Sequence, residues 1–92
     1  MKQDLIKSTS KKLTEIAEVL YKGDVKTGIA AMGLVISDLA EIISDIQDEE
    51  TKGKILQDVL TPALKAMEES DGTMLADIIS YELLEILGAL ER

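Results

Sequence analysis

The sequence contains no cysteine, which excludes disulfide bonds, thiol catalysis and cysteine-ligated zinc. It contains no histidine either, so Ser–His and Cys–His nucleophile pairs, imidazole metal sites and switches that titrate near neutral pH are excluded. Phenylalanine and tryptophan are also absent, and the aromatic residues are Tyr21 and Tyr81. The core must therefore consist of Leu, Ile, Val, Met and Ala, a composition that suits interlocking helices.

A basic or aromatic-rich surface is also lacking. The 92 residues have a formal net charge of −8. Residues 1–22 contain 5 basic and 3 acidic side chains, whereas residues 23–92 contain 5 basic and 15 acidic ones, which gives +2 and −10. Because most of this surface would repel duplex nucleic acid, nucleic-acid binding is not expected.

Long apolar runs are missing as well. The longest strictly apolar run, residues 29–36, is far shorter than the roughly 20 residues that a membrane span needs. The N-terminus contains lysines but lacks the apolar stretch of a signal peptide. These features predict a cytoplasmic protein with no membrane span.

What the sequence does contain is apolar residues that recur with the helical period of 3.6. Glycine and aspartate at Gly23-Asp24 and in the run 70–73 mark clear turns. With these turns, the pattern predicts an all-α domain over residues 1–92, built as an antiparallel up-down bundle of about four helices. The predicted helices cover residues 5 to the Gly23-Asp24 turn, 25–46, 51–69, and from the turn at 70–73 to 90.

The third predicted helix contains the only proline, Pro62. Its apolar phase is unbroken across the proline, which favours one helix kinked at Pro62. The alternative is two helices, with Thr61 as an N-cap and Pro62 in the first helical position. In the second predicted helix, Gly33 and Ala40 flank the apolar arc and are expected to let another helix approach closely.

Three stretches resemble known proteins. The hairpin LYKGD at 20–24, together with ALKAMEESD at 63–71 and LADIISYEL at 75–83, resembles segments of small all-helical bacterial proteins of uncharacterised function. The pattern is also similar to the flagellar export chaperone family of FliS type, whose members are antiparallel helix bundles that hold an unfolded export substrate. The resemblance implies a binding role and carries no catalytic motif.

Carboxylates form the first candidate site. Asp38, Glu41 and Asp45 share one stripe of a helix, and Glu82 and Glu85 are three residues apart on another. Paired carboxylates of this kind bind Mg²⁺ in all-α nucleoside-triphosphate pyrophosphohydrolases. The helical angles instead predict that the first stripe faces water, so no metal, cofactor or catalytic residue is expected. Glu82 lies at the border of the core face, where either partial burial with a raised pKa or pairing with a lysine is possible.

The second candidate site is apolar. Tyr81, Leu84 and Gly88 align on a face of the last helix other than the core stripe, and Leu34 lies among the acidic positions of the second helix. A second apolar strip on a bundle helix indicates either a covering partner or burial on two sides. The sequence therefore favours a protein–protein interaction module, homo-oligomeric or chaperone-like, with these four residues at the interface. The alternative is the Mg²⁺-dependent pyrophosphohydrolase-like enzyme.

Overall fold

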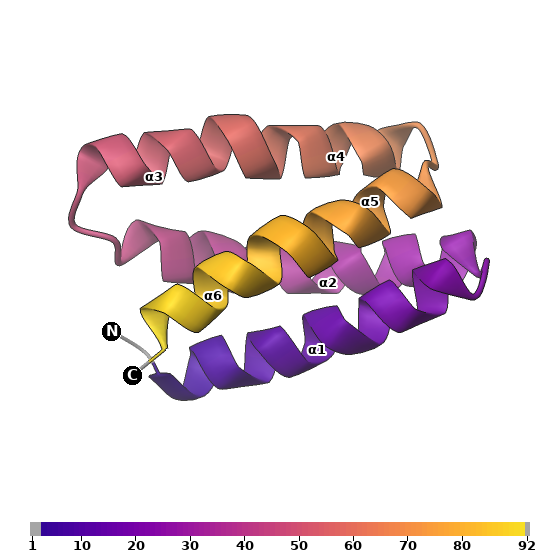
Figure 1. The fold of residues 1–92 in the computed structure, drawn as a ribbon, viewed down its shortest axis with the longest axis horizontal. Coiled ribbons are helices and arrows are strands. Elements are labelled where there is room, and N and C mark those ends of the chain that lie inside the picture. The colour runs from indigo at the N-terminus through magenta and orange to yellow at the C-terminus, as the bar shows by residue number, and fades with distance from the viewer. Residues whose placement is uncertain (1–2, 92) are drawn as a thin grey trace.

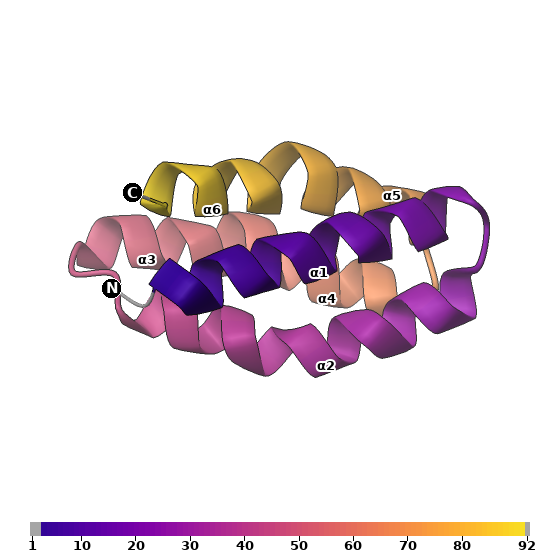
Figure 2. The ribbon, with the colours of Figure 1, turned by 90° about the horizontal axis from the view of Figure 1, so that it is seen from below.

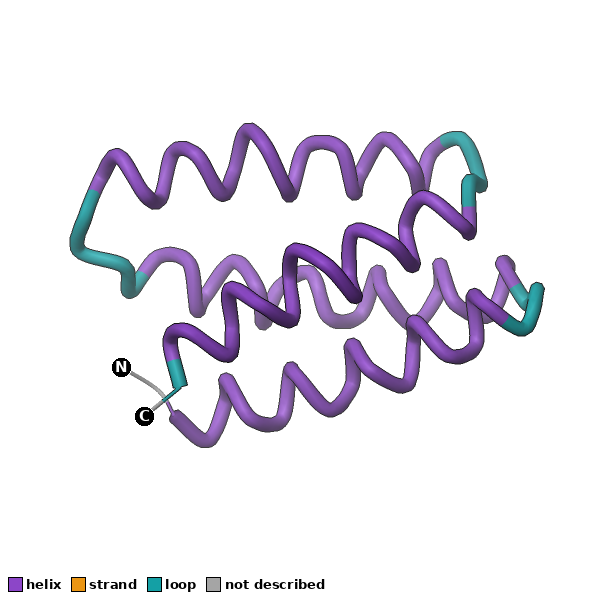
Figure 3. Tube along the Cα trace, viewed as in Figure 1, coloured by secondary structure: helices purple, strands orange, loops and turns teal. Residues whose placement is uncertain are grey.

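The computed structural model describes residues 3–91, of which 88% are helical, and no strand occurs among them (Figures 1 and 3). The all-α prediction is confirmed. Residues 3–91 contain four helical stretches, and two of them are each divided into three segments by a wider turn. Their bounds are α1 Gln3–Tyr21, α2 Val25–Ser44, α3 Glu49–Ile55 with η1 Leu56–Leu60 and α4 Thr61–Glu68, and α5 Gly72–Ile78 with η2 Ile79–Leu83 and α6 Leu84–Leu90.

The connections between successive stretches lie at alternate ends of the molecule (Figure 1). The α2 helix and the α5–α6 stretch lie on opposite sides, with α1 and the α3–α4 stretch between them (Figure 2). The α1 helix packs on α2 and on α5–α6, and at one end the Gln3 side-chain amide donates a hydrogen bond to the Leu90 carbonyl at 3.2 Å. The first and last helices are therefore neighbours.

Local capping fixes where the helices begin. Gly23 has a φ of +92°, a left-handed conformation that glycine adopts without strain. The Asp24 carboxylate then accepts a hydrogen bond from the Thr27 amide at 3.3 Å, and the Asp71 carboxylate accepts one from the Met74 amide at 3.0 Å. Both predicted turns are confirmed, because their determinants are local in sequence.

The third helix begins two residues earlier than expected. Its N-cap is Asp48, whose carboxylate accepts hydrogen bonds from the Thr51 hydroxyl at 2.7 Å and from the Glu50 amide at 3.1 Å. The hydrogen bond from Thr51, reinforced by that from Glu50, lowers the pKa of Asp48 below its ordinary value. Glu49 and Glu50 form the first turn, where the helix dipole favours negative charge.

The helix that contains Pro62 is continuous from Glu49 to Glu68, so the one-helix interpretation is confirmed. Leu60 and Thr61 have helical dihedrals, and Thr61 is not an N-cap. The Thr61 backbone amide and hydroxyl both donate to the Leu56 carbonyl, the hydroxyl at 2.9 Å, within the π-helical turn that precedes the proline. A kink at Pro62 stays a prediction.

The last helical stretch also contains a π-helical turn. Four of its buried side chains recur every fourth residue, at Leu75, Ile79, Leu83 and Leu87. An α-helix has 3.6 residues per turn, so a spacing of four would rotate the buried face by about 40° at each step. A turn with i→i+5 hydrogen bonds takes up this extra rotation. The uniform period of 3.6 was therefore wrong here, and the spacing of four is the signal that indicates the wide turn.

The packing of the third helix differs from its apolar pattern, and the expectation about Gly33 and Ala40 is wrong. Leu56 and Leu64 are 44% and 48% exposed, although they share the apolar side of the third helix in a projection with 3.6 residues per turn. Gly33 and Ala40 are exposed, and no atom of another helix lies within 4 Å of a Cβ built on Gly33. The close approach occurs instead at Gly28, where such a Cβ would lie 2.3 Å from Leu20 Cδ2.

Candidate functional site

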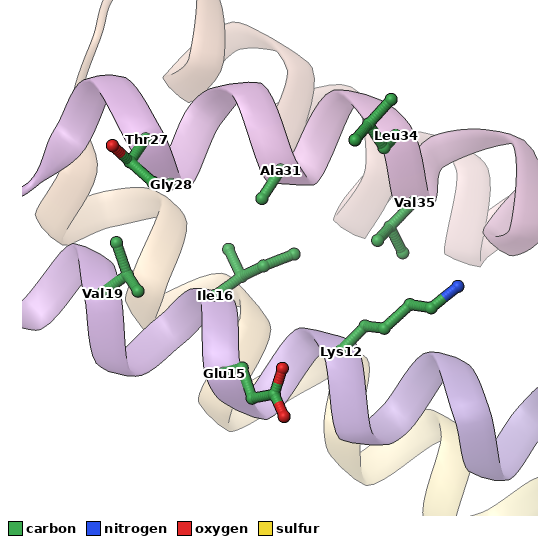
Figure 4. Close-up of a pocket in the computed structure, with 9 residues that line it drawn as sticks. All are labelled: Lys12, Glu15, Ile16, Val19, Thr27, Gly28, Ala31, Leu34 and Val35. Carbon is green, nitrogen blue, oxygen red and sulfur yellow. The ribbon is translucent and has the colours of Figure 1, made fainter.

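An apolar groove lies between α1 and α2 and opens to solvent (Figure 4). Its volume is about 330 Å³. On the α1 side, Ile16 and Val19 line it, and on the α2 side Ala31 and Val35 do so. The small Ala31 leaves the space between the helices unfilled. The remaining lining residues are Lys12, Glu15, Thr27, Gly28 and Leu34.

Leu34 lies at the rim of this groove. Its side chain is 81% exposed, the largest value among the exposed large apolar side chains of the described residues. In Figure 4 it extends away from the helix and is not inserted between α1 and α2. The sequence pattern predicted Leu34 as an interface residue, but the groove beside it depends on helix packing and had no sequence signal.

A salt bridge lies at one end of the groove. Lys12 Nζ lies 3.4 Å from Asp38 Oδ2, and the two side chains are 53% and 25% exposed. An exposed pair of this kind contributes about 0–1 kcal/mol, so its main effect is to place charge beside the apolar surface. Lys12 comes from the neighbouring helix α1, so the sequence around Asp38 does not indicate this pair.

The predicted strip on the last helix lies on the other side of the bundle (Figure 2). Tyr81 is 70% exposed and Gly88 is exposed, but Leu84 is half-buried and packs against the core. Tyr81 also lines a second, more open depression of about 360 Å³. That depression is formed by Val59, Tyr81, Glu82, Glu85, Ile86 and Ala89. Leu34 and the Tyr81 strip therefore belong to two separate surfaces.

The candidate metal ligands are not brought together. Asp38 and Glu41 lie on α2 and Asp45 is its C-cap, whereas Glu82 and Glu85 belong to the η2–α6 stretch on the opposite side of the bundle (Figure 2). Within residues 3–91, no group of three acidic side chains is arranged to hold a metal ion. Glu82 is exposed, so partial burial, one of the two alternatives for this residue, is wrong.

We expect calorimetric titration with Mg²⁺ or Mn²⁺ to show no stoichiometric site tighter than about 0.1 mM. The reason is that the two sets of carboxylates cannot reach one cation, and Asp38 already forms a salt bridge with Lys12. A stoichiometric binding heat that disappears in both Glu41→Gln and Glu82→Gln would contradict this prediction and would favour the enzyme alternative.

One polar contact joins two residues that are far apart in the sequence. The Tyr21 hydroxyl, at the end of α1, donates a hydrogen bond to Asp77 Oδ1 on α5 at 2.7 Å. This bond raises the pKa of Tyr21 above its ordinary value, because the carboxylate stabilises the protonated phenol. The partners are 56 residues apart, so no local pattern indicates the contact.

Among the described residues, α2 is the one helix that is long and apolar enough to cross a bilayer by length and composition. The corresponding 18-residue window is 33% buried within the bundle. A core helix of a water-soluble protein meets the same two criteria, so this observation is weak evidence for a span.

The fold and its surfaces define an all-α helix bundle with a solvent-open apolar groove. Over residues 3–92 the chain matches a family described as a domain of unknown function, DUF8042, and it belongs to this family. No curated protein and no solved structure matches the chain significantly. The similarity to export chaperones of FliS type stays a prediction.

Proposed function

We propose that this chain is a protein–protein interaction module without catalysis, and that the α1–α2 groove with Leu34 at its rim is a binding surface. The observation that carries the proposal is the 81% exposure of Leu34 beside a groove lined by Ile16 and Val35. Burying one leucine side chain contributes about 1.5–3 kcal/mol, so a partner that covers this position gains substantial free energy.

The character of the groove also supports binding of a protein side chain. Its floor is apolar, while Lys12 and Glu15 supply charge at its edge. An apolar centre with a charged rim is the usual arrangement of a protein interface. A chaperone-like module of the FliS type would hold an extended segment of another protein in the same groove, and a homo-oligomer would cover it with a second copy.

The enzyme alternative has less support. A Mg²⁺-dependent pyrophosphohydrolase needs carboxylates from two helices within reach of one cation. Here the α2 carboxylates and those of Glu82 and Glu85 are on opposite sides of the bundle (Figure 2).

A photo-reactive side chain introduced at Leu34 is expected to cross-link to a protein in cells that produce the chain. The same reagent at Gln57, which is exposed and lines neither depression, is the control. Mass spectrometry identifies the cross-linked peptide, which is either a copy of this chain or a different protein. The complex is then reconstituted from purified components.

In the reconstituted complex, Leu34→Glu is expected to weaken binding at least about tenfold, because a carboxylate replaces the apolar contact. The matched control is Leu64→Glu, at a partly exposed leucine that does not line the groove. It should bind as the wild type does. Equal cross-linking at positions 34 and 57, or equal loss in the two leucine variants, would refute the proposed surface.

A further inference from the structure

The outward face of α2 is nearly free of charge along its middle. Its nine exposed residues occupy one side of the helix, opposite the buried residues Met32, Val35 and Leu39. The charged members are Lys26 near the start and Glu41 near the end. The nine are Lys26, Thr27, Ala30, Gly33, Leu34, Ser37, Ala40, Glu41 and Ser44.

This face is complementary to itself when a second copy is turned end to end. In an antiparallel pair of helices, the numbers of two residues that lie opposite each other always add up to the same value. A two-fold axis between Gly33 and Leu34 makes that value 67. Lys26 of one copy then lies opposite Glu41 of the other, and Ala30 lies opposite Ser37. A parallel pair would instead oppose Lys26 to Lys26 and Glu41 to Glu41, which repel.

We propose that the partner of the α2 surface is a second copy of this chain, paired antiparallel about an axis between Gly33 and Leu34. The inference rests on the proposed interaction function and names its partner. Each Leu34 lies against Gly33 and Ala30 of the other copy, beside the mouth of the groove. Such close packing is available because no atom of another helix lies within 4 Å of a Cβ on Gly33.

The strip on the last helix is a poorer surface for self-pairing. Glu82 and Glu85 adjoin Tyr81 there, so a two-fold pair would bring acidic side chains of two copies together. Leu84, the central apolar residue of that strip, is already packed against the core. The α2 face has opposite charges at its two ends and a more exposed leucine.

A charge-exchange experiment tests the pairing. Sedimentation equilibrium from about 1 µM to about 1 mM chain, at about 0.15 M salt, should show a dimer for the wild type. Lys26→Glu and Glu41→Lys should each weaken it about tenfold, because two attractions per dimer become repulsions. The double variant should recover to within about threefold of the wild type, because the exchanged charges again attract across the axis. Circular dichroism confirms that each variant is folded.

Disulfide cross-linking gives the register independently, because the chain has no cysteine of its own. Residues 30 and 37 of one helix are about 10 Å apart along its axis. In the antiparallel pair, the two copies of residue 30 are therefore separated by about 10 Å along the axis, and so are the two copies of residue 37. Ala30→Cys alone, or Ser37→Cys alone, should then form a disulfide between copies only poorly. A mixture of the two variants should form the mixed disulfide preferentially, because residue 30 lies opposite residue 37 of the other copy.

A wild type that stays monomeric at about 1 mM overturns the inference, as does a dimer in which the double charge variant shows no recovery. In either case the proposed interaction function still stands if Leu34 cross-links to a different protein whose purified complex is weakened by Leu34→Glu. If the dimer is absent and position 34 cross-links no more than position 57, both the inference and the proposed function fail.

Discussion

Replacing Leu83 with alanine is expected to lower the free energy of unfolding by about 2–5 kcal/mol. The side chain is 1% exposed and belongs to the core in the π-helical turn of the last stretch. Its removal takes away buried apolar atoms and leaves a cavity that the surrounding helices fill only in part. Since a domain of this size has a total stability of about 5–15 kcal/mol, this loss is a large fraction. Chemical denaturation followed by circular dichroism measures it.

Ile36→Ala is the comparison for this measurement. The sequence pattern places Ile36 on the same core arc as its neighbours, but the structure shows a half-buried side chain at the margin of the core. Because part of the side chain is already in water, its truncation should cost clearly less than that of Leu83. Equal losses in the two variants would mean that the helix packing described here is incorrect.

Gly28→Ala and Gly53→Ala are expected to differ in stability by about 1–3 kcal/mol, with Gly28→Ala the less stable. Both glycines lie inside helices, so both variants gain the same helix propensity, about 1 kcal/mol. At Gly28 the new Cβ would lie 2.3 Å from Leu20 Cδ2 and 2.6 Å from Leu20 Cγ. Leu20 is buried, so it cannot move aside into solvent. At Gly53 no described atom lies within 4 Å of the added Cβ. The gain in helix propensity should therefore appear in full in the stability of Gly53→Ala.

The unfolding midpoint and its denaturant dependence give this difference directly. An additional Leu20→Val change should recover part of the loss in Gly28→Ala, because the shorter side chain leaves room for the new methyl group. A Gly28→Ala protein as stable as Gly53→Ala would show that α1 and α2 are further apart than described.

The elements of the fold were predictable because their determinants are local. Asp24 and Asp71 each cap the helix that follows, and the apolar periodicity marks the buried faces. The exposed position of Leu34 was also predictable, since it falls outside the apolar arc of its own helix. The spacing of four in the last helical stretch was misread as the ordinary helical period.

The features that remained hidden all depend on which helices become neighbours. The groove needs Ala31 to face Ile16, and the pairs Lys12–Asp38 and Tyr21–Asp77 join residues 26 and 56 positions apart. Thr9 is a further case. It is completely buried, and in the described part of the chain its hydroxyl has no hydrogen-bond partner, which its position in the sequence does not indicate.

The contact between the first and last helices has a consequence for synthesis on the ribosome. The face of α1 that packs on α5 and α6 lacks these neighbours until α5 and α6 have been made. At about 5–20 residues per second, the roughly 70 residues between the end of α1 and the end of α6 take about 3.5–14 s to translate. During that interval α1 and α2 can form a hairpin, but one apolar side of it stays open to water and to chaperones. Folding to the complete bundle therefore follows the emergence of α6.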